Sequence, residues 1–115
     1  MKIKVKDDMI IIGNVEHIFE NTINTIIILD NMILVHLLKE ERNKTDMSKQ
    51  TVNNVYAFTL EGDILWNIFD IIGEEHCITD IYIDDNNQLV AFSFFSIRFK
   101  IDLMKKIIVE KVSTK

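Results

Sequence analysis

The side chains best suited to metal binding are three histidines and one cysteine, His17, His36, His76 and Cys77. Structural zinc sites take most of their ligands in pairs a few residues apart, and these residues show no such ligand spacing. His76 and Cys77 are adjacent, and adjacent side chains on an extended backbone point to opposite faces. We therefore expect packing or surface histidines, a buried and inert cysteine, and no metal site.

Carboxylates and glycines are also present, but not in a catalytic or cofactor-binding pattern. Acidic neighbours occur at Asp7-Asp8, Glu40-Glu41, Glu74-Glu75 and Asp84-Asp85. Acid–base catalysis needs carboxylates whose environments separate their pKa values, whereas neighbours in polar turns are both solvated. Phosphate-binding loops need clustered glycines, and the three glycines stand apart. The run 84–87 has oxygens that suit calcium but lacks the EF-hand spacing, so we expect a turn there. From the carboxylates and glycines together, we expect no enzyme and no cofactor.

Charge is distributed unevenly along the chain, whose net charge is −5. Residues 50–97 hold eight acidic side chains and no basic one, whereas residues 98–115 hold six basic and two acidic ones. One interpretation is an ordinary solvated surface. The other is a docking face for a basic protein, to which we assign Asp70, Glu74, Glu75, Asp80, Asp84 and Asp85.

Composition and hydropathy restrict the class of protein. The 115 residues suffice for one domain, 1–115, with one core. The first ten residues carry charges where a signal peptide needs an apolar stretch, and no apolar run approaches the ~18 residues of a membrane span. We expect a cytoplasmic protein that binds no membrane.

Nucleic-acid binding is disfavoured by the overall acidity. Single-stranded nucleic acid is bound by aromatic side chains, on which bases stack, next to basic side chains. The segment closest to this pattern contains Phe92, Phe94, Phe95, Arg98, Phe99 and Lys100. We expect the alternating phenylalanines of this segment to lie in a central strand and in the core. Trp66 is expected to be a core residue as well.

β-Branched and aromatic residues dominate the apolar content and indicate strands. Polar turn residues between apolar runs predict four hairpins, over 25–38, 53–69, 79–94 and 97–109. In the second hairpin, alternation places Ile64, Trp66 and Ile68 on one face. Shorter strands are expected within 2–20, including an edge strand around Ile3 and Val5 and another at 17–19.

One segment has a competing helical interpretation. Residues 30–41 have apolar residues at helical spacing, and Asp30 is a suitable N-cap. An internal repeat favours a strand here, because the equivalent segment in the second copy, 89–94, is rich in β-formers. The polar insertion 40–52 in the first copy is expected to be a mobile loop.

The repeat has a period of 43 residues. The apolar residues Tyr56, Phe58, Leu60, Ile64 and Trp66 recur as Phe99, Ile101, Leu103, Ile107 and Val109. About 43 residues with four strands is the pattern of a propeller blade. We predict an all-β protein: N-terminal strands (2–20), then two consecutive four-stranded antiparallel meanders (24–69 and 78–112) packed as a sandwich or half-propeller.

Residues 55–66, repeated at 98–109, resemble the blade repeats of quinoprotein-type β-propellers. The resemblance consists of alternating apolar residues, the acidic-glycine turn 61–63 and the closing Trp66. The second copy departs from this pattern, with Val109 in place of the tryptophan and Lys105 in place of the glycine. The resemblance implies blade geometry, but two blades cannot close a ring, so it implies no cofactor or metal.

These features together predict a protein-binding module. In size and charge the chain is similar to small acidic bacterial immunity proteins, so we expect an immunity or antitoxin role in which a basic toxin domain is neutralised by occlusion of its active site. One alternative is a structural half-propeller that self-associates through open sheet edges. Another is a small-ligand binder with its pocket between the meanders.

Overall fold

Strands make up nearly all regular structure in the computed structural model, which describes residues 2–39 and 51–113. The elements are β1 (Ile3–Lys6), β2 (Met9–Ile12), β3 (Val15–Ile18), β4 (Thr22–Ile28), β5 (Ile33–Leu38), β6 (Val55–Phe58), β7 (Ile64–Asn67), α1 (Phe69–Ile72), β8 (Ile78–Ile83), β9 (Leu89–Ser93), β10 (Ile97–Asp102) and β11 (Ile107–Ser113). Within the described residues, no helix is long and apolar enough to cross a membrane.

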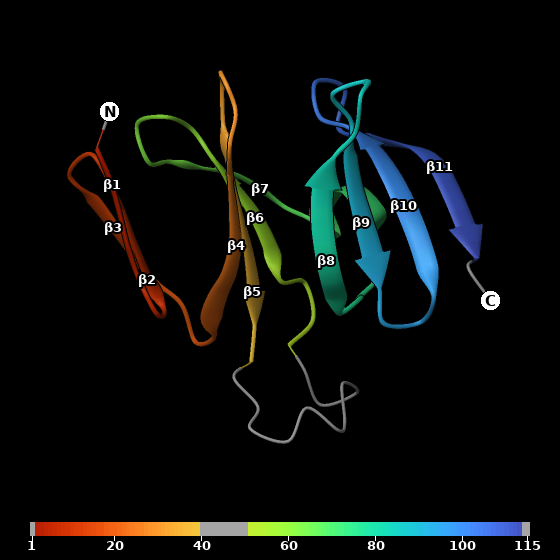
Figure 1. The fold of residues 1–115 in the computed structure, drawn as a ribbon, viewed down its shortest axis with the longest axis horizontal. Coiled ribbons are helices and arrows are strands. Elements are labelled where there is room, and N and C mark those ends of the chain that lie inside the picture. Colours follow the sequence, from red (N-terminus) through yellow and green to blue (C-terminus); the bar gives the residue numbers. More distant parts are fainter. Residues whose placement is uncertain (1, 40–50, 114–115) are drawn as a thin grey trace.

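The strands form three antiparallel sheets, in which strands that follow each other along the chain are hydrogen-bonded neighbours. We call them the N-terminal sheet (β1–β3), the central sheet (β4–β7) and the C-terminal sheet (β8–β11). The predicted all-β class is confirmed, and so are the two successive four-stranded meanders. The central sheet lies between the other two (Figure 1).

The central sheet is buried on both faces. On β5, Ile33 and Val35 pack toward the N-terminal sheet, in a core that includes Ile10 and Ile12. Leu34 belongs to the second core, between the central and C-terminal sheets. A strand covered on both faces has a continuous apolar run instead of an alternating one. This is why residues 33–38 form a strand, as the repeat predicted, despite their helix-like pattern.

The repeat has a structural counterpart in the stacking of the sheets. On β6, Phe58 faces the N-terminal sheet. On β10, the equivalent Ile101 and its neighbour Phe99 face the central sheet. Each meander therefore uses the same face of its third strand to pack against the sheet that precedes it. The buried Trp66 packs between the two meanders, as expected.

Two ion pairs lie on the outer face of the C-terminal sheet, beside the exposed apolar side chains of Tyr82 and Val112. Arg98 on β10 forms an ion pair of 2.7 Å with Glu110 on β11. Lys100, on the same face of β10, lies 3.5 Å from Asp84. Terminal units of stacked arrays need polar groups on their outer face, and the two ion pairs supply some of them.

The helix α1 was not predicted, and hairpin 53–69 was expected to continue as a strand through Ile68. Asn67 changes the chain direction, because its Oδ1 accepts the N–H of Phe69. Gly73, at φ +80°, ends the helix. The strand expected at 17–19 lies instead at 15–18.

The expected position of Ile64 on one face with Trp66 and Ile68 was also wrong. A register shift between Ala57 and Phe58 places Ile64 opposite Phe58, whereas Trp66 lies opposite Ala57. Ile64 therefore leaves the face shared by Trp66 and Ile68 and is 56% exposed. Most of the expected mobile loop, residues 40–50, lies outside the described residues.

Candidate protein-docking surface

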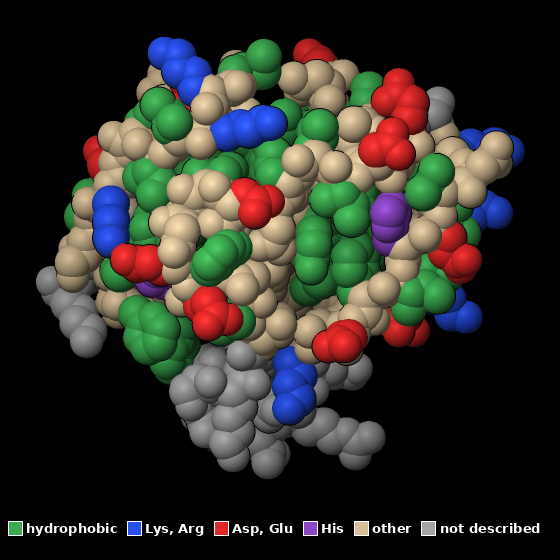
Figure 2. Space-filling model, turned by 180° about the vertical axis from the view of Figure 1, so that it is seen from behind, with side chains coloured by type: hydrophobic (Ala, Val, Ile, Leu, Met, Phe, Trp, Pro, Cys, Tyr) green, Lys and Arg blue, Asp and Glu red, His purple; other side chains and the backbone are tan. Residues whose placement is uncertain are grey.

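The six acidic residues assigned to a docking face do not gather at one place. Five of them lie along or beside the edge strand β8. Glu74 and Glu75 come before the strand, Asp80 lies within it, and Asp84 and Asp85 come after it. A six-residue strand is about 20 Å long, so its two ends form separate acidic sites. Asp70 lies apart from them, in α1. On the face shown in Figure 2, acidic side chains are spaced apart and form no continuous patch.

Three of these carboxylates are used in local structure. Asp84 Oδ1 accepts the backbone N–H groups of Asn86 and Gln88 at 2.9 and 3.0 Å. These hydrogen bonds, with that from Gln88 the larger effect, hold the pKa of Asp84 below its usual value, and Lys100 adds to the effect. Asp70 accepts the backbone N–H of Asn67, and Asp80 accepts the backbone N–H of Ile81.

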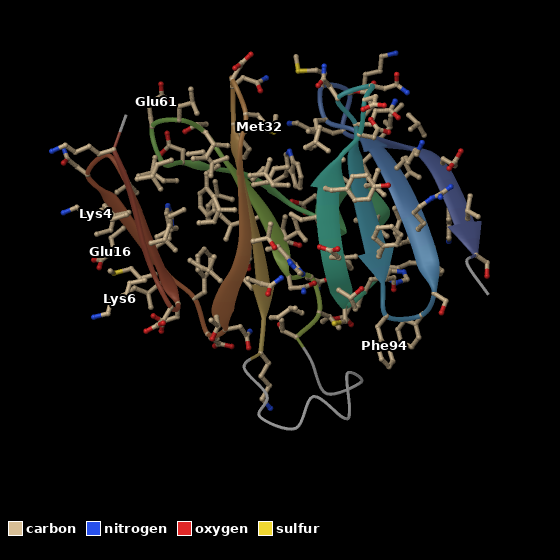
Figure 3. All side chains as sticks on the ribbon, viewed as in Figure 1. Lys4, Lys6, Glu16, Met32, Glu61 and Phe94 are labelled. Atoms are coloured by element: carbon tan, nitrogen blue, oxygen red, sulfur yellow. The ribbon has the colours of Figure 1, made fainter. Side chains whose placement is uncertain are left out.

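The structure adds two residues beside Glu74 and Glu75, of which Phe94 was expected in the core. β9 ends at Ser93, and the hairpin tip that follows carries Phe94 and Phe95, which are 38% and 59% exposed. Their rings meet edge to face at 5.6 Å. In Figure 3 Phe94 points away from the sheets. We call residues 93–96 the aromatic tip.

A sequence signal for this exposure exists in the dipeptide itself. Adjacent side chains in a strand point to opposite faces, so one core cannot bury both Phe94 and Phe95. Of the alternating phenylalanines expected in the core, Phe94 is exposed and Phe92 is half-buried, whereas Phe99 on the next strand is fully buried.

Backbone hydrogen bonds fix the conformation of the aromatic tip. Phe94 N–H donates to Cys77 O at 2.9 Å, and Ser96 N–H donates to Ser93 O at 3.0 Å. Phe95 N–H donates to Ser93 Oγ at 3.2 Å. The two rings are thus presented on an ordered backbone, and an ordered binding residue loses less entropy when it meets a partner.

A chain of side chains supports the tip from behind. Ser93 Oγ lies 2.7 Å from His76 Nδ1, and His76 Nε2 lies 3.3 Å from Glu74 Oε2. The order serine, histidine, carboxylate matches that of a hydrolase triad. However, Ser93 and His76 are each only 5% exposed, and Ser93 Oγ already accepts a backbone N–H. These three hydrogen-bonded side chains therefore position the tip and the ring of His76. The centroids of the His76 and Phe95 rings are 6.1 Å apart.

A buried polar network anchors this region to the central sheet. Asn54 donates to Leu37 O and Ile78 O and accepts the N–H of Ile78, at distances of 2.7 to 2.9 Å. His36 Nε2 also reaches Ile78 O, at 2.6 Å. Its pKa is lowered because burial outweighs the hydrogen bond to Ile78 and the charge of Asp80.

Cys77 is buried, and burial raises the pKa of its thiol. The reactive thiolate is correspondingly scarce at neutral pH. Among the residues that the structure describes, no three His, Cys, Asp or Glu side chains are grouped so that they could hold a metal ion.

Comparison with known proteins identifies a family without assigning a function. No curated protein and no solved structure is significantly similar to the chain. A family model matches residues 1–110, which is nearly the whole sequence. The chain therefore belongs to the family described as a domain of unknown function, DUF7957.

Proposed function

We propose that the protein is a cytoplasmic protein-binding module that docks a basic partner at the aromatic tip. The observation that carries this proposal is the exposure of Phe94 and Phe95 on an ordered hairpin. Exposed aromatic side chains cost solubility, and aromatic anchors in partner pockets supply much of the binding energy of protein interfaces.

Electrostatics supports a basic partner. Glu74 and Glu75 are exposed next to the tip, and Glu74 is joined to it through His76 and Ser93. The segment 50–97, which contains the tip, has no lysine or arginine. A segment with charges of one sign accelerates association with a positively charged partner. This acceleration decreases as the salt concentration rises, because salt screens the charges.

The partner class that we favour is a toxin domain. In this model the protein is an immunity or antitoxin protein: the two phenylalanines enter the toxin's active-site cleft, and the glutamates pair with basic residues at its rim. Inhibition is then steric and requires no catalysis by the protein. The support for this class is the small size and the acidity of the chain.

The first experiment compares the wild-type protein with the double variant Phe94→Ser/Phe95→Ser as baits in its own organism. A basic protein bound by the wild type and absent from the variant is then purified, and its affinity is measured by calorimetry. We expect the double variant to bind at least about 100-fold more weakly. Phe69→Ser is the matched control, because Phe69 is also exposed but lies on α1. Equal affinity of wild type and double variant would overturn the proposal.

The immunity role has its own test with the same partner. The purified partner is expressed in a sensitive host, together with either form of the protein. We expect growth to be rescued by the wild type and by Phe69→Ser but not by the double variant. A partner that is harmless when expressed alone contradicts the toxin assignment and leaves the docking site standing.

A further inference from the structure

A cavity of about 240 Å³ lies where the end of β3 meets the start of β6. Its apolar lining comes from Ile18, Phe19, Leu37, Val52 and Tyr56, and its polar lining comes from Glu20, Asn21, Thr51, Asn53 and Asn54. The rings of Phe19 and Tyr56 are 5.4 Å apart and form an aromatic wall.

Two acceptor groups of this lining, Asn53 Oδ1 and the Glu20 carboxylate, have no partner within residues 2–39 and 51–113. Asn54 is saturated, because its amide already makes three hydrogen bonds. Asn53 Oδ1 is buried and has no hydrogen-bond partner among the described residues. Glu20 forms no ion pair in the described part of the chain, and no lysine or arginine of that part lines the cavity. A ligand that brings N–H donors and a positive charge would satisfy both groups.

Asn53 links the wall of the cavity to His76, the residue that supports the aromatic tip. Asn53 N–H donates to His76 O at 3.0 Å, and the His76 ring contacts Phe95. Asn53 therefore forms part of the cavity wall and is also bonded to the residue that supports the tip.

We propose that this cavity binds the guanidinium group of an arginine side chain. A planar guanidinium stacks on aromatic faces, so the Phe19–Tyr56 wall suits it better than it suits an ammonium group. Its several N–H groups match the carboxylate of Glu20 and the unpaired acceptor of Asn53. That this arginine belongs to the basic partner rests on the proposed function.

The test uses a probe that needs no partner. N-acetyl-arginine amide is titrated into the full chain and followed by backbone amide NMR shifts of Thr51, Asn53 and Asn54. The control probe is N-acetyl-citrulline amide, which has the same shape without the charge. We expect millimolar binding of the arginine probe and binding at least about fivefold weaker for citrulline.

Two variants locate the charge. Glu20→Gln is expected to weaken the arginine probe by about threefold. Glu16→Gln is the matched control, because Glu16 is exposed on β3 and Figure 3 shows it on the outside of the N-terminal sheet. Equal binding of the two probes, or no shift at these amides, overturns the cavity assignment.

The two proposals can fail separately. The double variant Phe94→Ser/Phe95→Ser should keep its arginine binding, because neither phenylalanine lines the cavity. Loss of partner binding in that variant without any arginine binding to the wild type would overturn only the cavity assignment. Arginine binding with undiminished partner affinity in the variant would overturn only the docking site.

Discussion

His36 and Ile78 join the central and C-terminal sheets: the Nε2 of His36 lies 2.6 Å from the carbonyl oxygen of Ile78. A carbonyl only accepts hydrogen bonds, so the proton of the ring is on Nε2. The other ring nitrogen, Nδ1, lies 3.2 Å from the amide nitrogen of Asn24 and acts as its acceptor. The neutral ring thus satisfies both neighbours at once, and a second proton on Nδ1 would break the contact with Asn24.

This geometry predicts a pH dependence of stability. The pKa of His36 in the folded protein is below the ordinary value of 6.5, so the unfolded chain binds a proton first as the pH falls. The free energy of unfolding should be highest above pH 6.5 and decrease as the pH falls from there to the folded pKa. Urea denaturation at about pH 7.5 and about pH 5.5 measures the difference. The variant His36→Gln, which keeps a donor for Ile78, should show a smaller decrease, and an unchanged decrease would contradict the assignment.

Asn54 should be among the most sensitive positions for stability. Replacing it by leucine keeps the approximate volume but leaves Ile78 N–H and Leu37 O without their buried partner. We expect Asn54→Leu to lower the free energy of unfolding by about 3 kcal/mol. Asn86→Ala, at an exposed turn position, serves as control and should change it by less than about 0.5 kcal/mol. A small effect of Asn54→Leu would show that the network is not required.

Gly62 couples the N-terminal and central sheets. Its φ is +100°, and a Cβ built on it would lie 2.8 Å from Cβ of Val15. His17 Nε2 also lies 2.6 Å from the carbonyl oxygen of Gly62. Gly62→Ala should therefore cost about 3 kcal/mol of stability, measured by thermal or urea unfolding.

Gly13 provides the comparison for that substitution. Its φ is +61°, but nothing lies within 4 Å of a Cβ built there. Gly13→Ala should cost only about 1 kcal/mol, from backbone strain alone. Equal costs for the two glycines would show that the contact with Val15 is unimportant.

The aromatic tip should contribute little to stability. Because Phe94 and Phe95 are exposed, the double serine variant should unfold within about 1 kcal/mol of the wild type. Phe99→Ala, in the core, should cost more than about 3 kcal/mol. Urea denaturation of both variants gives the comparison. A large loss of stability in the tip variant would mean that the phenylalanines serve the fold and would weaken their assignment as anchors.

Cys77 should resist thiol reagents in the native protein. The side chain is buried, and its raised pKa keeps it protonated at neutral pH. A colorimetric thiol reagent should react slowly with the native protein and rapidly in urea. Rapid reaction in native buffer would show that the segment around Cys77 opens readily, and the aromatic tip, which bonds to its carbonyl, would then not be fixed.

The sequence by itself determined the all-β class, the hairpins and the two meanders. These features depend on local chemistry: β-branched residues favour extended backbone, and turns such as 61–63 and 84–87 supply the residues that hairpins need. The repeat also resolved the one segment with two interpretations. Residues 33–38 form a strand because both of its faces are covered, and that burial is visible in the sequence as an uninterrupted apolar run.

The tertiary structure decided the positions of the residues that could serve function. The acidic residues are close in sequence, yet β8 separates Glu74 and Glu75 from Asp84 and Asp85 by the length of a strand. Conversely, Phe95 and Glu74 are far apart in the sequence, and the fold brings both into contact with His76. Exposure of Phe94 depends on where β9 ends, and exposure of Ile64 depends on a one-residue register shift. Such positions are set by pairing between strands and packing between sheets, which residue spacing alone does not specify.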